Sequence, residues 1–195
     1  GNNTISNITA DQIYTGALSN TGEVLELRDA SDNLIDLVTF SSGWPTGQAS
    51  PNYISMERIS STNAAVSANW ANNNRISRNG LDSGNPSNAI NGTPKAQNSV
   101  SKSSTVIIGG LSLTENLTFT RLGSPYILYS GTIEVQSNIT MTIEPGTFIK
   151  FRGDTKMLIH GNLIAQGTSA NQIVFTSDTD SDTESNGGYY IYFDT

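Results

Sequence analysis

The sequence predicts an all-β fold, and three observations support this. The chain of 195 residues contains 21 Asn, 22 Thr and 25 Ser, which favour turns and strand surfaces over helix interiors. Its Val, Ile, Leu, Phe and Tyr residues fall in short alternating runs that can bury one face of a strand. After about residue 105 these runs become regular and are separated by Gly, Pro or Asn. We therefore expect a folded chain, rich in strands and poor in helix.

Charge and hydropathy exclude several classes of protein. The chain has 10 Lys and Arg against 17 Asp and Glu, a net charge of −7, which argues against nucleic acid as a partner because nucleic-acid-binding proteins present a basic face. The longest apolar runs, 106–108 and 127–129, are far shorter than the ~20 residues of a membrane span. Residue 1 is Gly, and no basic and apolar leader follows it. We expect a secretion signal to have been removed or to lie outside this chain.

A change in pattern divides the chain into two regions. Residues 1–99 contain both Trp residues and most of the Asn, with irregular spacing, whereas residues 105–195 form short alternating strands. The polar run 97–104 has no apolar periodicity and is typical of a linker, which we place at 100–104.

In the first region the pattern predicts three strands. Residues 23–28 and 34–40 are strand-like and flank an Asp- and Asn-rich turn, so we expect a hairpin. Residues 54–59 form a third strand, in which alternation directs Ile54 and Met56 toward a core. Most of 72–98 is predicted to be loop.

The order of several short motifs in this region resembles the second, C-terminal half of a bacterial lamin-tail domain. The resemblance covers about residues 14–98 and implies an immunoglobulin-like β-sandwich in which Trp44 and Trp70 pack as core or rim anchors. The opening strands of that family should precede Tyr14, so the sandwich would be incomplete and would leave an exposed strand edge. The motifs are 18–23, Leu25-Glu26-Leu27, Ile35-Asp36, Gly43-Trp44-Pro45, 55–59, Asn69-Trp70, Gly92-Thr93-Pro94 and Asn98.

The second region is predicted to form stacked turns of a parallel β-solenoid. Strand-like segments of three to five residues alternate with Gly, Pro or Asn turns. Ile143 and Ile159 occupy matching positions, 16 residues apart, and this offset is a plausible partial turn. The fold requires the apolar side chains to lie in register from one coil to the next. The segments are 132–135, 139–143, 148–151, 157–160, 163–165, 173–175 and 190–193.

Four segments, 124–128, 139–151, 161–168 and 173–177, resemble the N-terminal cap and first rungs of a bacterial extracellular right-handed parallel β-helix. This resemblance covers about residues 115–195. Together, the two resemblances imply an all-β chain in which an incomplete lamin-tail-like sandwich precedes the start of a parallel β-helix. Such stacks normally need a cap at their ends.

The densest group of possible metal ligands is an acidic run near the C-terminus. Asp178, Asp180, Asp182 and Glu184 alternate along the chain, and carboxylate oxygens suit Ca²⁺. The spacing departs from an EF-hand, because the sixth position is Thr183 and the twelfth is Tyr189. Two interpretations stay open, a Ca²⁺ site and a solvated acidic loop.

The residues give little indication of catalysis. His160 is the one histidine, and no Gly-x-Ser-x-Gly motif accompanies it, so we expect an outward-pointing His rather than part of a nucleophilic relay. A carboxylate pair for glycosidic cleavage could come from Glu115, Glu134, Glu144 or Asp154, although Glu144 belongs to a Glu-Pro-Gly turn that the β-helix resemblance makes structural. The aromatic residues are Tyr189, Tyr190, Tyr192 and Phe193. Packing on the two faces of a strand explains them better than a surface on which sugar rings stack.

These observations favour a secreted, extracellular or cell-surface bacterial protein with a structural or adhesive role and no catalytic activity in this segment. Its partners would be a cell-surface or matrix polysaccharide or protein, or other copies of itself. Two alternatives remain. One is a self-assembling filament subunit, and the other is a Ca²⁺-dependent β-helix protein that binds or cleaves polysaccharide.

Overall fold

The structure is a computed structural model that describes residues 5–13, 15–178 and 190–193. The chain forms two compact units, Gly1–Ser101 and Lys102–Thr195. In the described residues no helix is long and apolar enough to cross a membrane. The helical elements among the residues described are three short 3-10 turns, η1 (Ser67–Asn69), η2 (Ser99–Ser101) and η3 (Arg121–Gly123).

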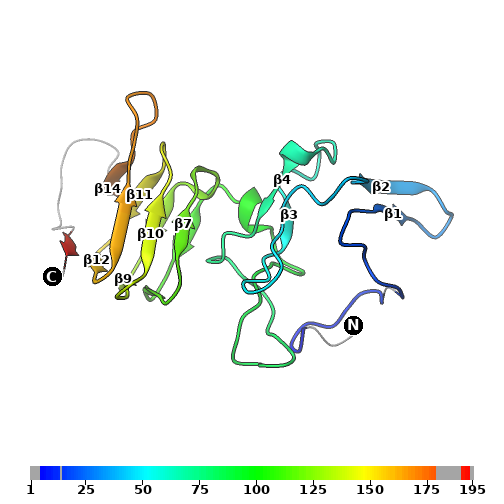
Figure 1. Cartoon of the computed structure of the whole chain (residues 1–195), viewed down its shortest axis with the longest axis horizontal. Coiled ribbons are helices and arrows are strands. Elements are labelled where there is room, and N and C mark those ends of the chain that lie inside the picture. Colours follow the sequence, from blue (N-terminus) through cyan, green and yellow to red (C-terminus); the bar gives the residue numbers. More distant parts are fainter. Residues whose placement is uncertain (1–4, 14, 179–189, 194–195) are drawn as a thin grey trace. The chain divides into compact units, whose positions relative to one another are not determined.

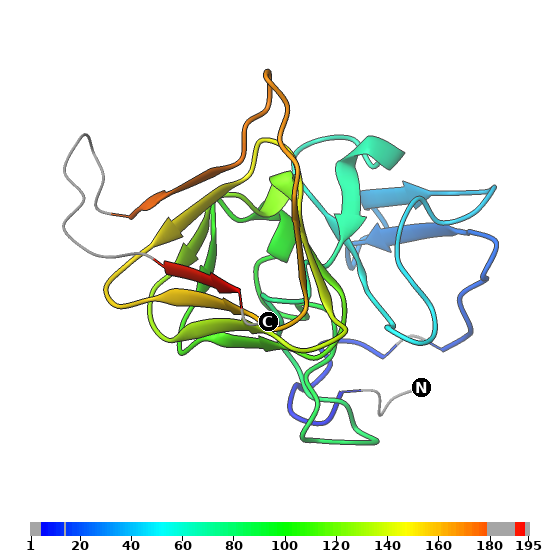
Figure 2. The same cartoon turned by 60° about the vertical axis from the view of Figure 1, so that its left-hand side comes forward.

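The second unit is a parallel β-solenoid of about three turns, as predicted (Figure 1). Its strands form three parallel sheets, in the orders β13-β10-β7, β14-β11-β8-β5 and β15-β12-β9-β6. Figure 2 shows these strands running around a common interior. The strands are β5 (Thr105–Ile107), β6 (Leu111–Leu113), β7 (Leu117–Phe119), β8 (Tyr126–Leu128), β9 (Thr132–Val135), β10 (Thr140–Ile143), β11 (Phe148–Phe151), β12 (Lys156–Ile159), β13 (Asn162–Ala165), β14 (Val174–Ser177) and β15 (Tyr190–Phe193).

Each inward side chain of the solenoid stacks on its counterpart in the next turn. Ile133 of β9 pairs with Met157 of β12, and both side chains are 0% exposed. Residues between these inward positions, such as Glu134 and Leu158, are more exposed because strand alternation turns them outward. The other buried stacking side chains are Ile107, Leu113, Leu117, Phe119, Tyr126, Leu128, Val135, Met141, Ile143, Ile149, Phe151 and Ile159.

The predicted 16-residue offset is part of one turn, but it does not bring Ile143 and Ile159 to matching positions. Ile143 pairs with Ala165, whereas Ile159 pairs with Val135, so the two isoleucines lie in different sheets. One full turn places Met157 over Ile133, 24 residues later, because three strands and three corners must be crossed. The offset of 16 residues leads from β10 past β11 to β12, which is part of one turn of the solenoid.

The solenoid also begins earlier than the resemblance implies. The resemblance covers residues from about 115, but β5 starts at Thr105 and pairs in parallel with β8. Strands β5, β6 and β7 contain three residues each, and the segments that carry the resemblance start only at residue 124.

The first unit contains two small antiparallel sheets. β1 (Val24–Arg28) pairs with β2 (Leu34–Thr39), which confirms the predicted hairpin. β3 (Met56–Arg58) pairs with β4 (Trp70–Asn72). The Asp29 carboxylate accepts hydrogen bonds from the backbone N–H groups of Ser31 and Asn33, and bonds to Asn33 hold the pKa of Asp29 below its usual value.

The inward side of the third predicted strand differs in part from the prediction. Ile54 is buried, as expected, but Met56 is only partly buried. The neighbouring Glu57 is 4% exposed. Hydrogen bonds to its carboxylate, rather than apolar alternation, decide which residue of β3 points inward.

Ionisation of Tyr126 should control stability at high pH. Burial against the solenoid interior raises the pKa of Tyr126 to about 12, whereas an unfolded tyrosine ionises near pH 10. The folded state therefore loses stability as the pH rises from 10 to 12, by about 2–3 kcal/mol at most. Tyr126→Phe should remove most of this loss and change stability at pH 7 by about 1 kcal/mol or less. Urea unfolding at pH 8 and pH 11.5 measures both effects. An equal loss in parent and variant would contradict the assignment.

Candidate functional site

A buried carboxylate organises the first unit. One oxygen of Glu57 accepts hydrogen bonds from Asn73 Nδ2 at 2.8 Å and Thr93 Oγ1 at 2.5 Å. Its other oxygen accepts from the backbone N–H of Ser99 at 2.8 Å and from Ser99 Oγ at 2.6 Å. Four hydrogen bonds satisfy the buried charge. Glu57 thereby joins β3 to Asn73 and Thr93 in loops and to Ser99 of η2, all distant in sequence.

Asparagine side chains shape the loop that follows β4. The Asn73 side-chain oxygen accepts from Arg75 N at 2.7 Å, and that of Asn74 accepts from Ser77 N at 2.8 Å. Asn79 Nδ2 donates to Pro94 O at 2.7 Å. These side-chain bonds take the place of the backbone hydrogen bonds between paired strands. They explain how the segment 72–98, predicted to be mostly loop, is held in one conformation.

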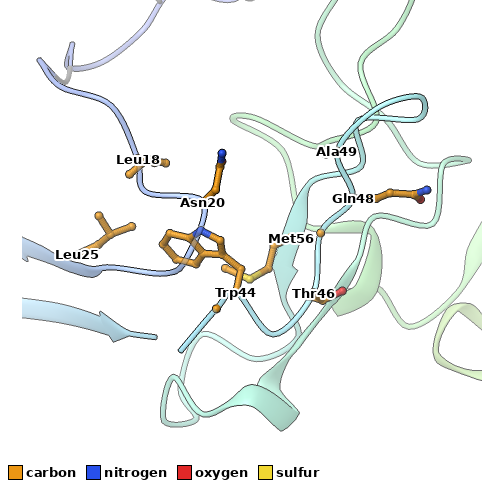
Figure 3. Close-up of a pocket in the computed structure, with 10 residues that line it drawn as sticks. Leu18, Asn20, Leu25, Trp44, Thr46, Gln48, Ala49 and Met56 are labelled. Atoms are coloured by element: carbon orange, nitrogen blue, oxygen red, sulfur yellow. The ribbon is translucent and has the colours of Figure 1, made fainter. Parts of the chain in front are cut away.

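A groove of about 800 Å³ opens beside Trp44 (Figure 3). Leu18, Leu25 and Met56 line it together with the indole, and the amide residues Asn20 and Gln48 contribute polar groups. Figure 3 shows Leu18 and Leu25 on one side of the indole and Gln48 on the other. An apolar floor with a few amides is the usual composition of a small-molecule site.

Trp44 is held firmly in this groove. Its Nε1–H donates to Ser19 O at 2.8 Å, and its ring meets the buried Phe40 edge to face, with centroids 6.2 Å apart. Phe40 makes a second edge contact with Trp70 at 6.2 Å. Trp44 and Trp70 therefore pack around one phenylalanine, while Trp44 also lines the groove.

The opposite wall of the groove is positioned from β4. Asn72 Oδ1 accepts hydrogen bonds from Gly47 N at 2.7 Å and from the Thr46 hydroxyl. The wall thus depends on a side chain 25 residues further along the chain. Sequence alternation gave no signal for this contact.

The predicted calcium ligands fall mostly outside the described residues. Asp180, Asp182 and Glu184 lie outside them, and Asp178 is the one ligand that the structure describes. Its carboxylate lies 3.5 Å from the Arg152 guanidinium, whose other contact is the Tyr129 ring at 4.7 Å. Within residues 5–13, 15–178 and 190–193, no group of three or more His, Asp or Glu could hold a metal ion. The four-ligand site stays a prediction.

Three of the residues considered for catalysis, His160, Glu134 and Glu144, are engaged in local contacts. His160 Nε2 lies 3.2 Å from Glu134 Oε1 on the outer surface of the solenoid. Glu144 accepts a hydrogen bond from Arg121 N at 2.8 Å, which ties its turn to η3. Both arrangements join neighbouring turns of the solenoid.

Comparisons with family models, curated proteins and solved structures found no match to this chain.

Glu57 offers a direct test of how the first unit is held together. Glu57→Gln replaces an acceptor oxygen by an NH₂ group, which would face donors that the carboxylate now satisfies. We expect a loss of about 2–3 kcal/mol in the free energy of unfolding. Both Trp residues lie in the first unit, so urea unfolding followed by Trp fluorescence reports on it. Glu26→Gln, at an exposed pair with Arg28, is the control and should cost less than about 1 kcal/mol. Equal losses in the two variants would contradict the role of Glu57.

Proposed function

We propose that this chain is part of a secreted bacterial cell-surface protein with a structural or adhesive role, and that this segment performs no catalysis. The observation that carries the proposal is the stack of parallel strands with an in-register buried interior. Such a stack is rigid, and each added turn extends the same flat outer faces. A rigid element with regular faces suits repeated contact with a surface.

The composition of the outer faces supports this role. The outward positions on one sheet are Thr118, Thr142 and Ile164, which align in register on β7, β10 and β13. Ser112 on β6 and Thr176 on β14 are likewise outward and uncharged. Small hydroxyl side chains can bond to a sugar or to a peptide, so the partner we propose is a cell-surface or matrix polysaccharide or protein.

Three finer features belong to the same proposal. The first unit would be an incomplete lamin-tail-like, immunoglobulin-like sandwich, supported by the hairpin and by the packing of Trp44 and Trp70 around Phe40. The solenoid would be right-handed, as crossovers between parallel strands almost always are. The acidic run from Asp178 to Glu184 would bind Ca²⁺.

Localisation and adhesion test the proposal. Brief protease treatment of intact producing bacteria should release peptides of this chain, and fluorescent beads coated with the chain should be retained on the envelope or matrix fraction of those cells. Thr142→Glu places a charge on an outer face and should reduce retention about threefold or more without changing the melting temperature. Glu134→Gln, on another sheet, should leave retention unchanged.

Two results would overturn the proposal. One is recovery of the chain only from the cytosol. The other is release of unsaturated products from a polyuronate with Ca²⁺, which would indicate the enzymatic alternative.

A second candidate function is self-assembly, for which the exposed aromatic side chains of β14 and β15 offer a surface. Phe175 and Phe193 continue the inward stacks of Ile149 and Ile159, yet they are 37% and 64% exposed. Within the described residues, β13, β14 and β15 pair on one side only. The first turn of a second copy could cover them in a head-to-tail contact.

Sedimentation velocity over a dilution series tests self-assembly. Assembled species should appear at high concentration and disappear in Phe193→Asp. Phe148→Asp, at an exposed position on β11 outside the stacks, should retain them. A sedimentation coefficient independent of concentration would contradict this candidate.

A further inference from the structure

A second groove, of about 500 Å³, lies in the first unit beside an exposed tyrosine. Tyr53 is 70% exposed. The groove is also lined by Asn52, Asp82, Asn88, Ile90 and Asn91. One aromatic ring and several amide side chains therefore meet at one depression.

The backbone of Tyr53 is strained. Its φ is +43°, in the left-handed region where a side chain with a Cβ is disfavoured and glycine is the usual residue. The strained turn is fixed on both sides, because Tyr53 N–H donates to Ala49 O at 3.0 Å and Ile54 N–H donates to Gln48 O at 2.8 Å. Folding alone would favour glycine here, and a strained bulky residue beside a groove indicates a functional role for its ring.

The polar residues of the groove are held in place. Asn91 Nδ2 donates to Asn52 O at 2.6 Å, and Ser55 N donates to Asn91 O at 2.8 Å. Asp82 uses one carboxylate oxygen to accept from Gly84 N at 2.8 Å, which leaves the other oxygen as an acceptor. Asn88 is exposed at the rim and can offer both a donor and an acceptor.

Charge limits the class of ligand. Asp82 is the carboxylic acid among the lining residues, and the Arg78 guanidinium lies outside the lining and donates to Asn91 Oδ1 at 3.5 Å. An anionic ligand would meet the Asp82 carboxylate. A neutral ligand with many hydroxyl groups and a flat apolar face fits the ring, the amides and the carboxylate together.

We propose that this groove binds a neutral hexose unit of a polysaccharide, with the C–H face of the sugar stacked on Tyr53 and its hydroxyls bonded to Asn88 and Asp82. The site uses residues of the first unit only. It is therefore independent of the proposed role of the solenoid faces.

Affinity electrophoresis of the full chain tests the proposal. Native gels would contain galactomannan, laminarin, hydroxyethylcellulose or, as the anionic probe, polygalacturonate. We expect retardation in at least one neutral gel and none in polygalacturonate.

Tyr53→Gly is the decisive variant. It relieves the left-handed strain, so its melting temperature should equal or exceed that of the parent, while the dissociation constant for the retarding polysaccharide should rise about tenfold or more. Tyr53→Phe should keep most of the affinity because it keeps the ring. Tyr129→Ala, which removes an exposed tyrosine of the second unit, is the matched control and should bind as the parent does.

Asn88→Ala tests the proposed hydroxyl contact independently, at an exposed position on the rim of the groove. It should raise the dissociation constant for the retarding polysaccharide about threefold or more. The proposal is overturned if no neutral gel retards the chain, if Tyr53→Gly binds like the parent, or if polygalacturonate alone retards it. Loss of binding in Thr142→Glu with no loss in Tyr53→Gly would also overturn it, while leaving the proposed adhesive role of the solenoid intact.

Discussion

The second unit depends on returning each inward side chain to the same position in every turn. The corners therefore stack as closely as the strands do. Gly110 and Gly131 occupy equivalent corners with φ of +88° and +81°. A Cβ added to Gly131 would lie 2.5 Å from Gly110 N, and one added to Gly110 would lie 2.6 Å from Thr132 O. Glycine is required at both corners, because the backbones of neighbouring turns approach too closely for any side chain.

The first unit is held together by a different interaction. Its buried apolar side chains include Phe40, Ile54 and Val100, and its buried polar ones include Glu57, Asn69, Asn73 and Ser99. A buried network of this kind stabilises only while every donor and acceptor is paired. It also fixes one arrangement of loops that have few ladder bonds, and this explains how an Asn-rich segment can carry two defined grooves.

Sequence patterns predicted what depends on alternation and missed what depends on contacts between distant residues. The ranges 132–135, 148–151 and 190–193 are strands as predicted, because their four residues show the alternation directly. Ile143 and Ile159 do not occupy matching positions, because corner lengths vary and leave no fixed period in the sequence. Glu57 was assigned no role, since its partners lie 16 to 42 residues away. Tyr53 was missed because a positive φ leaves no mark in the sequence.

The functions proposed for the two units would use different kinds of position. In the solenoid, the inward residues are fixed by stacking, so only outward positions such as Thr142 can be changed for binding without loss of fold. In the first unit, the strained Tyr53 is tolerated because the next residue, Ile54, is buried and bonded through its backbone to Gln48 in both directions, at 2.8 and 3.0 Å. The cost of the strained residue is thus offset by its neighbour, and the ring is free to face solvent. Folding does not explain why a groove should include Tyr53, whose backbone is unfavourable and whose ring is exposed. Binding of a ligand to that ring, as proposed above, would explain it.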